Sequence, residues 1–195
     1  MDRESELELV RRLRSGDGDA FDRIHAEFNG RLFSFLARLS RRRDVAEDLL
    51  EETWLRVVER APKLRPDTSL APYLFTVARN LYVSYCRSRM LEDAQSMDTI
   101  GLWPLGTPRP SPFEFTVANE TGRRLEQALA SLPAAYREAL LLVAVEGMKP
   151  AEAATVCGIS PEAMRQRISR ARAVIARRLD DADAAILVAL KVVTT

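Results

Sequence analysis

The sequence is poor in the residue types that most often bind metals or form disulfides. It has two cysteines, Cys86 and Cys157, and one histidine, His25, among 195 residues. The cysteines lie far apart in helical patterns, and no other ligand types cluster around the histidine, so we expect reduced thiols and no metal site. His25 is interpreted as a structural or surface residue.

Other absences narrow the class of protein further. The sequence has no glycine-rich nucleotide loop and no serine or cysteine paired with a base, so we expect no enzyme activity, no cofactor and no small-molecule substrate. No apolar run approaches the ~20 residues that span a bilayer, and no signal segment leads the chain. We therefore expect a cytoplasmic protein without membrane insertion.

Charge is nearly balanced overall but is segregated along the chain. The formal net charge is +1, yet residues 61–90 carry five basic side chains and one acidic, and residues 121–179 carry ten and five. The intervening residues 91–120 carry five acids and one arginine. Two basic blocks on either side of an acidic segment indicate two places where a polyanion is held.

Apolar residues recur at helical spacing through most of the chain, which predicts an all-α protein. We expect two helical domains, residues 1–90 and 121–180, joined by a flexible linker over residues 91–120 and followed by an apolar tail over residues 181–195. Four prolines and few basic residues are typical of such a linker. In the first domain, helices are predicted over residues 6–14, 20–39, about 44–60, and from a cap at Thr68 or Ser69 onward.

The last helix of the first domain has a mixed face. The sequence predicts burial of Leu74, Val77, Ala78, Leu81 and Tyr85. On the other side lie Thr76, Arg79, Asn80, Val83 and Arg87, beside the rings of Tyr73, Phe75 and Tyr82. Arginines, an asparagine and flat rings could contact phosphates and stack on unpaired bases, although aromatic residues at this spacing are also typical of a core.

Residues 148–179 have the pattern of a helix-turn-helix. The first helix is predicted from Pro150 to a stop at Gly158, and Ser160 caps the second, with Pro161 at its first position. On the second helix the sequence predicts a buried face of Met164, Ile168, Ala171 and Ile175. The opposite face carries Glu162, Gln166, Ser169 and Ala173, flanked by Arg165, Arg170 and Arg172. This pattern favours a DNA-reading helix over a merely solvated basic helix.

Two stretches, in this order, resemble one protein family. The segment GDGDAFDRIHAEFNGRLFSFLARLSRRRDVAEDLLEETWLRVVER, continuing to APYLFTVARN, resembles the promoter-melting domain of bacterial sigma factors of the extracytoplasmic-function group. The segment SLPAAYREALLLVAVEGMKPAEAATVCGISPEAMRQRISRAR is similar to the promoter-reading domain of the same family. Together they cover roughly residues 10–90 and 122–179. The resemblance implies a sigma factor that binds core RNA polymerase and promoter DNA, is masked by an anti-sigma factor, and directs DNA melting and transcription initiation.

The resemblance also implies roles for individual residues. The polymerase-docking positions are Asp48, Glu51 and Glu52. The positions that bind and melt the minus-ten element are Lys63, Arg65, Tyr73, Thr76, Arg79, Asn80 and Arg87. The positions that read the minus-thirty-five element are Arg165, Gln166, Ser169, Arg170 and Arg172.

Several positions depart from the family pattern. Glu51 replaces a glutamine, Tyr73 stands where tryptophan is common, and Gln166 replaces a serine but can bond an adenine edge. Lys149 precedes the first helix of the helix-turn-helix where a capping serine is usual, which should cost about 1 kcal/mol of helix stability.

Two alternatives to a working sigma factor are a plain repressor and a decoy. A repressor with one helix-turn-helix would leave the acidic helix of residues 44–60 and the mixed face after Ser69 without a role. A sigma-like decoy would sequester an anti-sigma factor without binding DNA, and we expect it to lose the basic DNA-facing residues that this chain keeps. Trp103, Phe113 and Phe115 in the linker are hypothesised to dock transiently on a domain or on polymerase.

Overall fold

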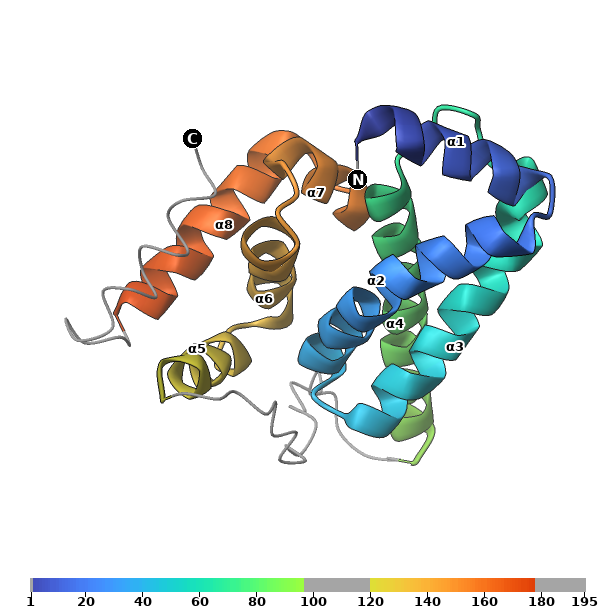
Figure 1. Ribbon diagram of the computed structural model, residues 1–195. Coiled ribbons are helices and arrows are strands. Elements are labelled where there is room, and N and C mark those ends of the chain that lie inside the picture. Colours follow the sequence, from blue (N-terminus) through green and yellow to red (C-terminus); the bar gives the residue numbers. More distant parts are fainter. Residues whose placement is uncertain (1, 97–119, 178–195) are drawn as a thin grey trace. The chain divides into compact units, whose positions relative to one another are not determined.

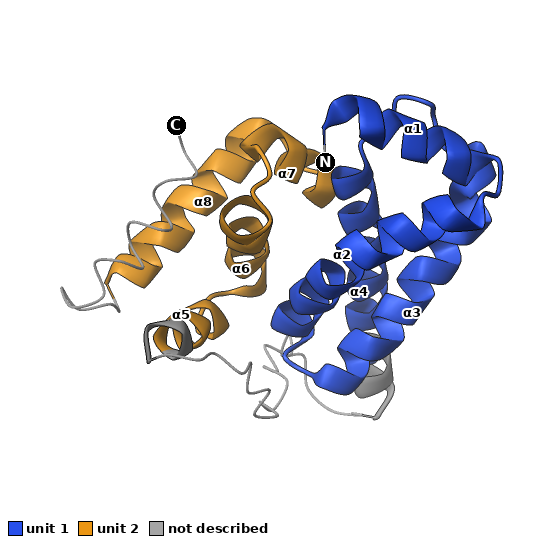
Figure 2. Cartoon of the chain, in the orientation of Figure 1, with its two compact units in different colours: residues 1–111 blue, residues 112–195 orange. Residues whose placement is uncertain are grey.

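The computed structural model describes residues 2–96 and 120–177 (Figure 1). These residues form helices and no strand, so the predicted all-α class is confirmed. The chain divides into two compact units, residues 1–111 and 112–195 (Figure 2). Within the described ranges, no helix is both long and apolar enough to cross a membrane. The linker aromatics and the apolar tail lie outside the described residues.

The described part of unit 1, residues 2–96, is a bundle of four helices. They are α1 (Arg3–Arg14), α2 (Gly18–Ser40), α3 (Arg43–Arg60) and α4 (Leu70–Ser96), with a 3₁₀ turn η1 (Ala61–Lys63) after α3. Helices α2, α3 and α4 pack against one another, and α1 packs on α2 and η1. Helix α4 continues to Ser96, beyond residue 90, where the sequence analysis ended the first domain.

The turn between α1 and α2 is held by one carboxylate. Asp17 caps α2 by accepting from the backbone N–H of Ala20 at 3.2 Å, and it pairs with Arg12 of α1 at 2.7 Å. The hydrogen bond from Arg12 is the main reason that the pKa of Asp17 is lowered. Gly16 takes the positive φ of 81° that lets the chain reverse here.

The interior of unit 1 corrects one expectation about α4. Phe75 is fully buried and packs edge to face against Phe35 of α2, with ring centroids 5.1 Å apart, so it cannot offer a ring to an unpaired base. The hydroxyl of Tyr82 donates to the carbonyl of Leu39 at 3.1 Å. Of the predicted stripe, Leu74, Val77 and Ala78 are buried, whereas Leu81 and Tyr85 are only half-buried. Because α4 packs against both α2 and α3, Phe75 is buried as well, outside the stripe predicted from one-sided burial.

Unit 2 is built around the last described helix. Its elements are α5 (Glu120–Ala130), α6 (Ala134–Leu140), a π-helical turn η2 (Leu141–Val145), α7 (Pro150–Cys157) and α8 (Pro161–Ala176). Helices α6 and α7 both pack on α8. Their contact is a dense apolar core that includes Leu140, Leu141, Leu142, Met164 and Ile175.

A buried arginine closes the end of α5. Arg137 on α6 is 7% exposed, and its guanidinium donates to the carbonyls of Leu129, Ala130 and Leu132 at 2.9–3.0 Å. The last carbonyls of a helix have no partner within the helix, so this fork supplies what α5 lacks. Its neighbour Glu138 lies 3.9 Å from Arg167 of α8.

Replacing Arg137 by leucine is expected to destabilise unit 2 by about 3 kcal/mol, because the three carbonyls lose a charged donor. The measurement is amide exchange of peptides from α5 and α6 in the full chain, which should become faster. Arg137→Lys keeps the positive charge but loses the forked guanidinium, so its exchange rate should lie between those of wild type and the leucine variant. Amide exchange of peptides from α2 and α3, in unit 1, serves as the control. Wild-type exchange in the leucine variant would contradict this capping role.

Candidate nucleic-acid interface

The helix-turn-helix forms through its own turn chemistry. Gly158 ends α7 in the left-handed region at φ 64°, and the hydroxyl of Ser160 accepts from the N–H of Ala163 at 3.1 Å to start α8. At the start of α7, where a serine cap is lacking, the side chain of Glu152 accepts from the N–H of Lys149 at 2.8 Å. That bond is half of a capping box and offsets part of the missing cap.

Helix α8 has the two faces that the sequence predicts. Met164, Ile168, Ala171 and Ile175 are all buried, at 0–3% exposure. Glu162, Gln166, Ser169 and Ala173 are all exposed. Arg165 and Arg170 are also exposed and lie on either edge of this polar strip. The arrangement therefore presents hydrogen-bonding groups flanked by two guanidiniums.

The arginines of α8 differ in their exposure and in the side chains they contact. Arg172 is half-buried: its Nε and Nη2 atoms are shielded from solvent without a hydrogen-bond partner, and this desolvation lowers its pKa. Arg167 points toward Glu138 in the interior of unit 2. Arg165 forms an ion pair with Glu162 one turn earlier, so it must leave that carboxylate to contact another anion.

In unit 1, the predicted minus-ten residues fall into two groups. Lys63 and Arg65, before α4, are exposed, as are Asn80 and Arg87 along it. The other positions, Tyr73, Thr76 and Arg79, are intermediate in exposure. The structure thus places the exposed members on η1, the loop of residues 64–69 and one side of α4.

Two of the half-buried side chains carry hydroxyl groups that are either shielded from solvent or already bonded. The hydroxyl of Tyr73 is shielded from solvent without a partner, and this burial raises its pKa despite the opposing charge of Arg60. Thr76 donates its hydroxyl to the carbonyl of Pro72 at 2.6 Å, one turn earlier in α4. In this conformation the hydroxyl of Tyr73 does not reach solvent, and Thr76 keeps only acceptor capacity.

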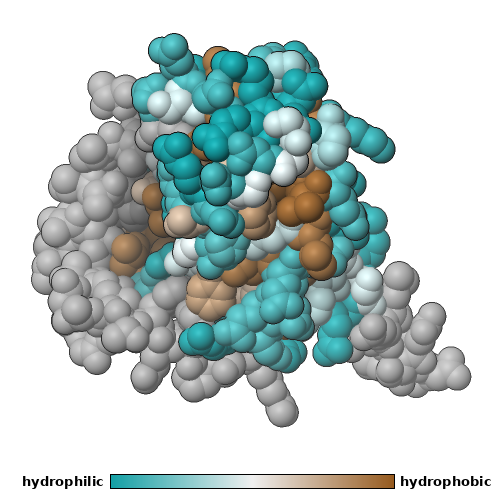
Figure 3. Space-filling model, turned by 45° about the vertical axis from the view of Figure 1, so that its right-hand side comes forward, coloured by the Kyte–Doolittle hydropathy of each residue, from teal (hydrophilic) through white to brown (hydrophobic). Residues whose placement is uncertain are grey.

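The acidic side of α3 includes exposed apolar side chains that were not among the predicted site residues. Asp48 and Glu51 are exposed, and Glu52 is partly exposed while pairing with Arg56 at 2.8 Å. Leu55 and Val58, four and seven residues after Glu51, are 61% and 52% exposed. Figure 3, in which the right-hand side of the Figure 1 view comes forward, shows apolar surface among the hydrophilic.

The sequence alone indicates that these two apolar residues lie outside the core. Leu55 and Val58 fall outside the stripe that Val45, Leu49 and Val57 define by helical stepping, so they are apolar residues with no predicted core to enter. Contiguous exposed apolar area with a polar rim marks protein-interaction sites, and these two residues with the neighbouring carboxylates have that composition. Among the described side chains, no group of three or more potential ligands could hold a metal ion.

Comparison with protein families matches both units. Residues 25–91 match the family model of Sigma-70 region 2, and residues 122–175 match that of Sigma-70 region 4. The chain is 34% identical over 161 residues to the RNA polymerase sigma factor CarQ of Myxococcus xanthus, covering 83% of this chain and 90% of CarQ. It is 33% identical to the ECF RNA polymerase sigma factor EcfG of Rhodopseudomonas palustris, covering 76% and 78% of the two chains.

Solved structures share the fold. The sigma factor RpoE of Bartonella quintana, crystallised with the anti-sigma factor NepR, aligns with a TM-score of 0.64 and 25% identity over 80% of this chain and 94% of RpoE. CnrH, in complex with the cytosolic domain of CnrY, aligns with a TM-score of 0.66 and 24% identity over 91% and 98%. The second likeness is one of fold alone.

Proposed function

Because the chain belongs to the extracytoplasmic-function group of RNA polymerase sigma factors, we propose that each exposed surface described above has one task in transcription initiation. The protein is an alternative sigma factor that directs core RNA polymerase to promoters. The observation that carries the assignment of tasks is the exposed strip of α8 edged by Arg165 and Arg170. Binding energy drives its action, and it performs no reaction of its own.

Helix α8 would enter the major groove of the minus-thirty-five element. Gln166 can bond an adenine edge with two hydrogen bonds, while Arg165 and Arg170 can reach guanine edges or phosphates on either side. Ser169 lies between them on the same strip and can bond either a base or a phosphate. Arg172 is half-buried, so its contribution would be to support the edge of the strip more than to read bases.

The loop of residues 64–69 and the exposed side of α4 would act on the minus-ten element. Lys63, Arg65 and Arg87 supply positive charge for phosphates, and Asn80 supplies an amide for a base edge. Holding an unpaired base offsets the few kcal/mol needed to take it out of the duplex. Neutralising phosphates releases counterions, so promoter affinity should fall steeply as salt increases.

The acidic side of α3 would dock on core polymerase. Asp48, Glu51 and Glu52 supply negative charge that steers a basic partner, and Leu55 and Val58 supply apolar area beside it. DNA and polymerase are both cytoplasmic, so this activity places the protein in the cytoplasm. RpoE is bound to an anti-sigma factor in its structure, and we extend such a partner to this chain.

Transcription by the purified chain with core polymerase on a pool of randomised promoters tests this assignment. Initiation should be enriched at a two-part motif, and Asn80→Ala should weaken it with core binding retained. Glu27→Ala, an exposed substitution on α2, is the matched control. If the chain binds an anti-sigma factor tightly but initiates nowhere in the pool, the decoy function replaces the sigma function.

A further inference from the structure

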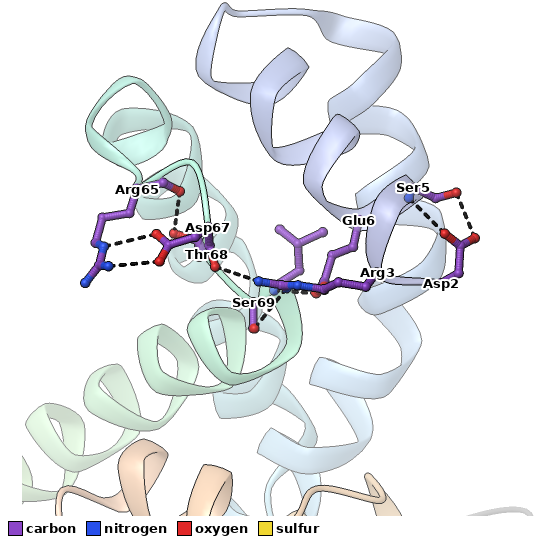
Figure 4. Close-up of polar contacts among 9 residues, drawn as sticks. Asp2, Arg3, Ser5, Glu6, Arg65, Asp67, Thr68 and Ser69 are labelled. Carbon is purple, nitrogen blue, oxygen red and sulfur yellow. Dashed lines mark hydrogen bonds and ion pairs between the residues drawn. The ribbon is translucent and has the colours of Figure 1, made fainter.

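The first helix of the chain is bonded to the loop that precedes α4 (Figure 4). The guanidinium of Arg3 donates to the carbonyl of Asp67 at 2.7 Å and to the hydroxyl of Ser69 at 3.0 Å. The carboxylate of Glu6 accepts from the backbone N–H of Leu70 at 2.7 Å. Arg3 and Glu6 also pair with each other at 2.5 Å, so the four contacts form one connected set.

Helix α4 depends on Glu6 because its own sequence does not supply a cap. Pro72, at the third position of α4, has no N–H for a capping side chain to bond. The hydroxyl of Thr68 turns back to the carbonyl of Arg65 at 2.7 Å, and that of Ser69 is held by Arg3. Neither Thr68 nor Ser69 therefore makes the side-chain cap predicted from sequence. A carboxylate from 64 residues upstream takes that place, where the helix dipole favours negative charge.

Helix α1 is firmly placed, so it can hold the loop still. Leu9, Val10 and Leu13 are buried at 0–4% exposure against the rest of unit 1. Its own start is capped by Asp2, which accepts from the N–H and the hydroxyl of Ser5 at 3.0 and 2.9 Å. The side chain of Glu6 is only 17% exposed. Glu6 is thus anchored by burial, whereas the side chain of Arg3 is 49% exposed and is held by its bonds to Glu6 and to the loop.

The contacts pass through Asp67 to the exposed edge of the loop. Arg3 binds the backbone carbonyl of Asp67, and the carboxylate of Asp67 binds Arg65 through two bonds of 3.1 and 2.9 Å. The side chain of Arg65 is 82% exposed, so it faces solvent while the second half of its loop is bonded to α1 at Asp67 and Ser69. Part of the loop is therefore already bonded to α1 in the free chain, before any ligand arrives.

We propose that Arg3 and Glu6 are positioning residues for promoter opening. They hold residues 65–70 in the conformation that receives an unpaired base, so that the ordering of this loop does not have to occur at each capture. The inference rests on the proposed minus-ten role of the loop. It adds that α1, which carries none of the residues assigned to DNA or polymerase, controls the rate at which the promoter opens.

The variants that test this are Arg3→Ala and Glu6→Ala, with Glu6→Gln as the conservative change and the exposed Glu4→Gln as the matched control on the same helix. Glu6→Gln keeps an oxygen that can accept from Leu70 and should restore most of the contact. Amide exchange of a peptide spanning residues 64–73 in the free full chain reports the contact without reference to function. Opening is followed in holoenzyme by 2-aminopurine fluorescence in the minus-ten element of the promoter selected above.

In the two alanine variants, amide exchange over residues 65–70 should be faster. Promoter opening should be on the order of 10-fold slower, which is the factor expected when one loop residue must be ordered at each opening event. Core polymerase affinity should stay at the wild-type value, which separates positioning from general misfolding. Glu6→Gln should recover most of both effects, and Glu4→Gln should match wild type.

Arg65→Ala distinguishes failure of this inference from failure of the proposed function. If Arg65→Ala slows opening but the two alanine variants do not, or if their exchange is unchanged, the positioning role is wrong. If Arg65→Ala leaves opening unchanged, the minus-ten role of the loop is wrong, and the positioning role falls with it whatever the exchange data show.

Discussion

The double substitution Glu51→Lys/Leu55→Asp is expected to weaken binding to core polymerase by about 100-fold or more. Truncating a hot-spot residue near the centre of an interface costs about 2 kcal/mol or more, and a like-charge contact costs several kcal/mol in addition. Both side chains are exposed, with Leu55 at 61%, so the substitutions leave the core of unit 1 untouched. The measurement is the equilibrium affinity of the purified chain for core polymerase.

Two exposed residues elsewhere provide the matched control for this docking surface. Glu27→Lys on α2 changes the same charge, and Val145→Asp in unit 2 places the same carboxylate at an apolar residue that is 46% exposed. The combined control should bind core polymerase as wild type does. Equal affinities of the docking variant and the control would move the polymerase-binding surface away from α3.

Removing the two guanidiniums at the edges of the α8 strip should abolish most promoter-specific binding. Arg165→Ala/Arg170→Ala is expected to reduce affinity for the selected promoter by about 100-fold, because each good arginine contact to a base contributes about 1–3 kcal/mol. If both residues contact phosphates instead, the plot of log affinity against log salt should lose about two units of slope. The measurement is holoenzyme binding to a duplex minus-thirty-five element across a salt series.

The control for α8 removes the same charge elsewhere. Arg11→Ala/Arg23→Ala takes away two exposed arginines of α1 and α2 and keeps the strip intact. It should lower non-specific attraction slightly and leave promoter preference unchanged. A loss of affinity as large as that of the α8 variant would mean that total charge, and not the position of Arg165 and Arg170, carries the binding.

The helix-turn-helix shows how far local sequence can predict structure. Gly158 and Ser160 set the turn through bonds within a few residues of themselves, so their effect needs no distant contact. The buried and exposed faces of α8 follow from helical stepping alone, and every predicted member of both faces is where it was expected. Arg172, at the border between the faces, could not be placed in this way because its exposure depends on what packs beside it.

In unit 1, local sequence patterns did not predict the burial of Phe75 or the long-range hydrogen bonds. Phe75 looked available because stepping along α4 assumes one packed side, whereas α2 and α3 both cover the helix. The Glu6 bond to Leu70 and the Arg3 bond to Ser69 join residues more than 60 positions apart, so no local pattern indicates them. The burial of Arg137 likewise depends on tertiary packing, because its guanidinium bonds the carbonyl groups at the end of α5.

By itself, the sequence determined the all-α class, the helix-turn-helix and the arginine-edged strip of α8, because periodicity, caps and turns act over a few residues. Only the tertiary structure decided which side chains reach solvent and which bonds close over long stretches of chain. It buried Phe75, left Leu55 and Val58 exposed beside Glu51, and brought Glu6 to the start of α4. The physical reason is that burial and long-range hydrogen bonding depend on which helices pack together, and that packing is a property of the whole unit.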